Sequence, residues 1–105
     1  MEWISGHYNL IISDRAQEDI NAYIDTIMYT YAAPITAKKH YEELYNVFRK
    51  IQKYPFINAV RHNASLLLYG INVRRVNYKK MAVIYTIHEN IIHIHRVIAG
   101  SMIID

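Results

Sequence analysis

Hydrophobic positions repeat with a helical period in the first half of the chain and with a strand period near its end. The stretch "HYNLIIS" at residues 7–13 alternates and is rich in β-formers, which predicts a strand. Ser13 or Asp14 then offers an N-cap before a helix. The apolar residues of this helix recur at intervals of three and four and form one stripe: Ala16, Ile20, Tyr23, Ile24, Ile27 and Tyr31.

A second helix is predicted from about Pro34 to Tyr54, with Pro55 marking its end. Its buried side is expected to carry Tyr41, Leu44, Val47, Phe48 and Ile51. Residues 55–70 form a loop-like connector in which Leu66 to Tyr69 is a candidate short strand. Alternating segments at about 71–77, 81–88 and 91–98 follow, joined by tight turns at residues 78–80 and 88–90. They predict a three-stranded meander.

This order of elements predicts an α+β fold in a single domain spanning residues 1–105. We expect a twisted, mainly antiparallel sheet with an antiparallel two-helix hairpin on one face and an open opposite face. Alternation assigns two sets of side chains to the helix-covered core: Met81, Val83, Tyr85 and Ile87 from one strand, and Ile92, Ile94 and Ile98 from the next. His93 and His95 then point to the open face, where we expect Arg75 to join them.

Composition supports a folded intracellular protein. The chain is 52% hydrophobic with ten tyrosines, unlike a disordered chain. It has no cysteine, which fits a reducing cytoplasm and excludes disulfides and thiolate chemistry. We expect no membrane span and no signal peptide, because no apolar run is long enough and residues 1–6 lack a basic start.

Charge is segregated along the chain, although the net charge is only +3. Seven of the nine acidic residues precede position 44, and no acid occurs between Glu43 and Glu89. That interval carries eight cations: Arg49, Lys50, Lys53, Arg61, Arg74, Arg75, Lys79 and Lys80. Such asymmetry favours an anionic partner, either a nucleic acid or an acidic peptide, over a merely solvated basic face.

The sequence resembles the RelE/ParE superfamily of bacterial toxins from type II toxin-antitoxin modules over nearly its whole length. The similarity rests on four stretches in the family's order and spacing: "LIISDRAQEDINAYIDTI", "APITAKKHYEELYNVFRKIQKYPF", "VRRVNYKKMAVIY" and "IIHIHRVIAG". The resemblance implies the fold already predicted, a cytoplasmic location and neutralisation by an acidic cognate antitoxin. ParE-like members, also described as plasmid stabilisation proteins, inhibit DNA gyrase and thereby arrest growth.

RelE-like members are instead ribosome-dependent messenger ribonucleases, and the resemblance to them implies cations and a proton-transfer group on the open sheet face. Arg75 falls where one family lysine lies, and His93 or His95 is the candidate for proton transfer. However, Ala82 replaces a mid-sheet arginine, and the terminal "SMIID" supplies neither the arginine nor the tyrosine of the ribonuclease members. These departures favour a ParE-like toxin. A ribonuclease and a non-toxic degenerate binding module remain the alternatives.

The residues expected to bind a partner or nucleic acid are Arg61, Arg74, Arg75, Lys79, Lys80 and Arg96. We expect no cofactor and no metal, because His93 and His95 share a strand face but lack the third protein ligand that most zinc sites require. The expected partners are the antitoxin and either gyrase or the ribosome. The sequence leaves open a homodimer or a toxin-antitoxin hetero-oligomer.

Overall fold

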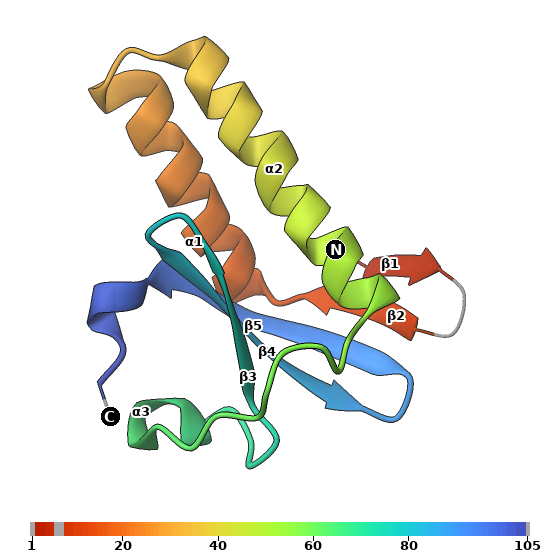
Figure 1. Cartoon of the computed structure of the whole chain (residues 1–105). Coiled ribbons are helices and arrows are strands. Elements are labelled where there is room, and N and C mark those ends of the chain that lie inside the picture. The colour runs from red at the N-terminus through yellow and green to blue at the C-terminus, as the bar shows by residue number, and fades with distance from the viewer. Residues whose placement is uncertain (1, 6–7, 105) are drawn as a thin grey trace.

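The computed structural model describes residues 2–5 and 8–104 of the chain (Figure 1). Their α+β order of elements agrees with the predicted fold class. Along the chain the elements are β1 (Glu2–Ser5), β2 (Tyr8–Ile12), α1 (Asp14–Asp25), a π-helical turn (Thr26–Thr30), α2 (Pro34–Lys53), α3 (Ala64–Leu67), β3 (Arg74–Tyr78), β4 (Met81–His88), β5 (Ile91–Ala99) and a 3-10 turn (Gly100–Met102).

The strands form one five-stranded sheet in the order β1-β2-β5-β4-β3. All neighbouring pairs are antiparallel except β2 and β5, which run parallel. A parallel pair needs a long connection, and here the helices, β3 and β4 all lie between the two strands in sequence. The sequence prediction missed β1. It began the following strand at residue 7, which lies outside the described residues, and the observed β2 begins at Tyr8.

The helix hairpin begins and ends where local chemistry predicts. The Ser13 hydroxyl accepts a hydrogen bond from the Ala16 N–H at 3.0 Å and so caps α1. Pro34 occupies the first turn of α2, where its missing N–H costs nothing. In Figure 1 both helices lie on one side of the sheet, while α3 and the C-terminal segment lie on the other.

The main core fills the space between this hairpin and the sheet. Val83, Tyr85 and Ile87 are buried in it and Met81 packs against it, as the alternation of β4 predicts. The Tyr85 hydroxyl donates to the Pro55 carbonyl at 3.0 Å and accepts from the Asn58 amide at 3.2 Å. Burial of this ring therefore also fixes the start of the connector after α2.

One predicted core position in β5 is wrong because the strand carries a bulge. Ile84 pairs with Arg96 while its neighbour Tyr85 pairs with Ile94, so His95 is an extra residue in β5. The extra residue reverses the alternation beyond it. Val97 therefore enters the main core, and Ile98, the expected core residue, is only partly buried.

The sheet face opposite the helices is not open, contrary to the prediction. A second cluster buries Leu66, Val73, Ala82 and Ile84 there, with Tyr69 and Ile103 packed against it. The candidate strand at residues 66–69 is instead the end of the short helix α3 and a turn. The apolar side chains of Ala82 and Ile84 explain the cover, because both faces of β4 have hydrophobic surface to remove from water.

Candidate functional site

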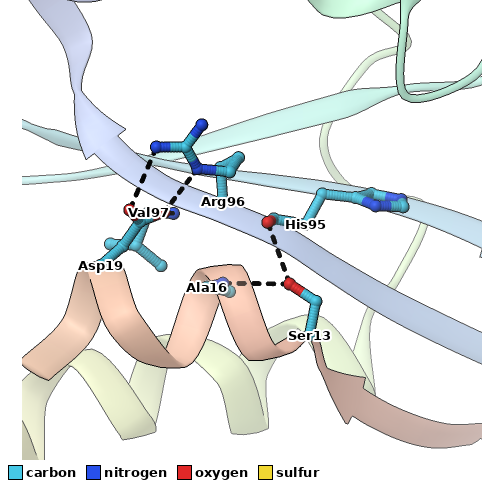
Figure 2. Close-up of polar contacts among 6 residues, drawn as sticks. All are labelled: Ser13, Ala16, Asp19, His95, Arg96 and Val97. Atoms are coloured by element: carbon cyan, nitrogen blue, oxygen red, sulfur yellow. Dashed lines mark hydrogen bonds and ion pairs between the residues drawn. The ribbon is translucent and has the colours of Figure 1, made fainter.

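The candidate residues of the sequence are distributed over both faces of the sheet, and each was located in the structure. Arg96 lies beside α1, where its Nε donates to Asp19 Oδ2 at 2.7 Å and its Nη2 donates to Asp19 Oδ1 at 3.1 Å (Figure 2). The same carboxylate accepts the backbone N–H of Val97 at 3.0 Å. The Asp19 hydrogen bond raises the pKa of Arg96. The charge of Arg96 is thus already matched inside the protein.

Asp19 can take this position because β2 ends before the later part of β5. The register pairs Ile12 with Ile94 and no farther, so α1 lies alongside β5 beyond that point. Ser13 strengthens the junction by donating its hydroxyl proton to the His95 carbonyl at 3.0 Å (Figure 2). Sequence reasoning missed Asp19, which lies 77 residues from Arg96. Asp19 is one of several acidic residues in the predicted amphipathic helix, so the local sequence does not single it out.

His93 and His95 come together on the face opposite the helices, as predicted. Their rings stack with centroids 6.0 Å apart, and the Tyr69 ring lies 5.2 Å from that of His95. His95 Nε2 and the Thr86 hydroxyl are 2.7 Å apart. Burial, and then the neighbouring His93, lower the pKa of His95. A neutral, half-buried imidazole is therefore favoured at this position.

Arg75 does not join the two histidines. Its Nε donates to Asn77 Oδ1 at 2.9 Å, and its guanidinium lies against Gly100, where an added Cβ would come within 2.8 Å of Nη2. Gly100 follows His95 by five residues, which corresponds to about 16 Å along an extended strand. The buried cluster of Ala82 and Ile84 covers the sheet face between them. The cation and the imidazoles therefore face different surroundings.

Arg74, the neighbour of Arg75 in β3, makes its contacts on the opposite side of the strand. Its guanidinium donates to the Asn58 carbonyl and lies 5.2 Å from the Phe56 ring. A second contact reaches the Phe56 carbonyl at 3.5 Å. Arg74 therefore holds the connector after α2, and the adjacent arginines in "RRVNYKK" differ in their surroundings although the sequence treats them alike.

The remaining candidate cations are more available to a partner. Lys79 and Lys80 form the β3–β4 turn, with Lys79 at φ 52° and its Nζ 5.7 Å from the Tyr78 ring. The Tyr78 hydroxyl donates to Glu43 at 2.7 Å, and this bond lowers the pKa of Glu43. Arg61 lies before α3 and its Nε is 3.5 Å from Asn63 Oδ1.

The structure describes residues 2–5 and 8–104. No cluster of three or more histidine or acidic side chains suited to a metal ion occurs there. No helix in these ranges has the length and apolar character needed to cross a bilayer.

The structure also reveals an apolar surface around α3, which the sequence did not predict. Its signal was the run Leu66-Leu67-Leu68, which a single short turn cannot bury entirely.

The fold is similar to that of a solved structure. A solved structure from a chromosomal ParDE toxin-antitoxin system of P. aeruginosa superimposes with a TM-score of 0.71, covering 90% of this chain and 98% of that one at 18% identity. At that identity the likeness concerns the fold. A search of curated proteins gave no match.

Residues 10–104 match the family described as the ParE toxin of the type II toxin-antitoxin system parDE. The match covers β2 to the C-terminal segment and leaves out only the first nine residues and the last. The chain therefore belongs to this toxin family, as the resemblance of the sequence indicated.

Proposed function

We propose that this chain is a bacterial toxin that arrests growth by inhibiting DNA gyrase, and that a cognate antitoxin neutralises it. The family match over residues 10–104 is the observation that carries the proposal. In this proposal, the chain acts in the cytoplasm. It stabilises a plasmid that encodes the module, because cells that lose the plasmid also lose their supply of antitoxin.

The distribution of charged groups favours inhibition of gyrase over cleavage of messenger RNA. A ribonuclease site needs a cation where phosphate charge develops and a proton-transfer group within reach of the same ribose. Here Arg75 contacts Asn77 and Gly100, whereas His95 contacts Thr86 and Tyr69. Ala82, at the place of the family's mid-sheet arginine, is fully buried. Inhibition by binding requires no such catalytic set.

The antitoxin is proposed to use the cations that the fold leaves available. Arg96 forms an ion pair with Asp19, and Arg74 is held by two carbonyls of the connector. We therefore assign partner binding to the candidate cations that have neither kind of contact among the described residues: Arg61, Arg75, Lys79 and Lys80. Neutralising these four together is expected to weaken antitoxin binding and to flatten its salt dependence, since fewer ion contacts are lost as salt rises. An unchanged salt slope would identify them as a merely solvated face.

The decisive experiment induces the chain without antitoxin and follows growth, plasmid supercoiling and translation separately. We expect growth to stop and purified gyrase to lose supercoiling activity, while a purified translation system continues to work. Messenger RNA cut at ribosomal A-site codons, and left intact by Arg75→Ala, would replace this proposal with the ribonuclease alternative. Normal growth in the presence of folded protein would exclude both toxin hypotheses, so that the non-toxic binding module would be the remaining one.

A further inference from the structure

The surface around α3 and the C-terminal segment exposes more aliphatic area than a short turn normally does. Its five exposed side chains come from α3, the turn after it and the last described residues: Leu67, Leu68, Ile71, Met102 and Ile104. Leu68 is 74% exposed and Ile71 is 86% exposed. We refer to these five residues as the α3–tail surface. Several exposed aliphatic side chains on neighbouring segments of a small protein indicate an interaction site.

Two hydrogen bonds join the two parts of this surface. The Ser65 hydroxyl donates to the Ile104 carbonyl at 2.6 Å, and the Ile104 N–H lies 3.2 Å from the same Ser65 oxygen. Between them, Ile103 packs inward against the buried cluster of Leu66 and Ile84. The segment is therefore apolar on its inner side and on its outer side. The inner side completes the fold, whereas the outer side chains Met102 and Ile104 are mostly exposed.

Cations lie next to both segments that form the α3–tail surface. Arg61 precedes α3 by three positions. Next to the C-terminal segment, the Arg75 guanidinium lies against Gly100, whose N–H donates to the Lys80 carbonyl at 2.8 Å. Among the described residues, none of these three cations forms an ion pair, since the pairs found are Lys38 with Glu42 and Arg96 with Asp19. The surface thus combines aliphatic contact area with unmatched positive charge.

Three kinds of occupant can be compared on these grounds. A second copy of the chain in a two-fold dimer would place this cation-flanked surface against itself, which is unfavourable. A nucleic acid would use the cations but would gain little from aliphatic side chains, since its bases prefer aromatic stacking partners. An amphipathic acidic peptide segment matches both properties, because it can bury apolar side chains and neutralise the flanking cations.

We propose that the α3–tail surface is the docking site for an acidic amphipathic segment of the antitoxin. This proposal rests on the proposed function, which supplies the partner. The segment buries Leu68 and Ile71 at the centre of the contact, with Arg75 and Lys80 at its rim. Central apolar residues are expected to dominate affinity, and rim cations are expected to dominate salt dependence.

The test measures binding of the full chain to the intact cognate antitoxin, by calorimetry at two salt concentrations. The double variant Leu68→Glu/Ile71→Glu replaces two exposed side chains, so the fold is expected to persist, and circular dichroism checks this. We expect its affinity to fall by about a hundredfold or more, the range for losing central contact residues. Arg75→Gln/Lys80→Gln should lower the salt slope with a smaller loss of affinity at high salt.

The control is Ile35→Glu, which introduces one of the two charges of the double variant at a residue 85% exposed at the start of α2, away from this surface. Its affinity should stay within about threefold of the original chain. Hydrogen exchange on the complex should show protection of residues 64–72 and 100–104. Equal binding by the double variant and the control, or no protection there, overturns the docking proposal while the proposed function stands.

Other outcomes separate the two proposals. If the antitoxin fails to bind the unmodified chain, the proposed function fails and this proposal fails with it. If light scattering shows a dimer that Leu68→Glu/Ile71→Glu dissolves, the occupant is a second copy. If duplex DNA competes with the antitoxin for the surface, the occupant is a nucleic acid. Either of these last two results overturns the assignment to an acidic segment.

Discussion

The Asp19–Arg96 pair provides the most direct test of how the helix hairpin is held to the sheet. One carboxylate accepts two hydrogen bonds from the guanidinium and one from the Val97 N–H. The two side chains are only 13% and 20% exposed, so water replaces these bonds poorly. Asp19→Asn keeps the shape of the side chain and removes its charge, so this substitution tests the ion pair.

The expected loss follows from what remains after this substitution. Removing one partner of a fully buried ion pair costs about 3–5 kcal/mol, because the other charge stays buried without compensation. The partial exposure of this pair lowers the figure, while the retained amide oxygen keeps one acceptor for Val97 or Arg96. We estimate a loss of about 2–3 kcal/mol in the free energy of unfolding. For a domain of this size, that corresponds to a melting temperature lower by roughly 10 °C.

The assay is urea denaturation monitored by circular dichroism, combined with a double-mutant cycle. Arg96→Met removes the cation and keeps much of the apolar stem, and the double variant removes both charges. If the pair acts as described, the double variant is less destabilised than the two single effects added together, with a coupling of at least about 1 kcal/mol. A single-variant loss below about 0.5 kcal/mol, or additive effects, would refute the reasoning.

Two further predictions concern side chains on the two faces of β4 and its neighbour. The lowered pKa of His95 means that the unfolded chain binds a proton more readily, so stability should fall as the pH drops below about 6.5. His95→Gln should reduce this decline, as measured by urea midpoints between pH 5 and 8; an identical decline would assign it to other groups. Tyr85→Phe leaves the Pro55 carbonyl without its buried donor and should cost about 1–2 kcal/mol at constant m-value. A loss of less than about 0.3 kcal/mol would show that this bond contributes little.

The sequence determined the two long helices and the strands β2 to β5, because each of these has a local physical signature. Ser13 predicted the start of α1 through its capping chemistry, and Pro34 and Pro55 marked the limits of α2. The alternation of β4 predicted which of its side chains enter the main core. The order of these elements also led to the toxin family, since four stretches of the chain carry the resemblance.

Tertiary structure decided the features that depend on contacts between distant residues. The bulge at His95 moved Val97 into the core, and nothing in the alternation of β5 signals an extra residue. The strand β1 was not predicted, because four residues near a chain end carry too short a pattern. The cover over Ala82 and Ile84 likewise requires residues 64–69 and Ile103 to fold back across the sheet.

The same distinction applies to the candidate site. The sequence identified a basic segment, since charge is a property of each residue alone. It placed Arg74, Arg75 and Arg96 among the partner-binding groups, with Arg75 also as the catalytic candidate of the ribonuclease alternative. Only the folded chain determines that Arg96 is bound by Asp19, that Arg74 is bound by the connector, and that Arg75 lies beside Gly100. Whether a cation is available to a partner depends on neighbours that are close in space and distant in sequence.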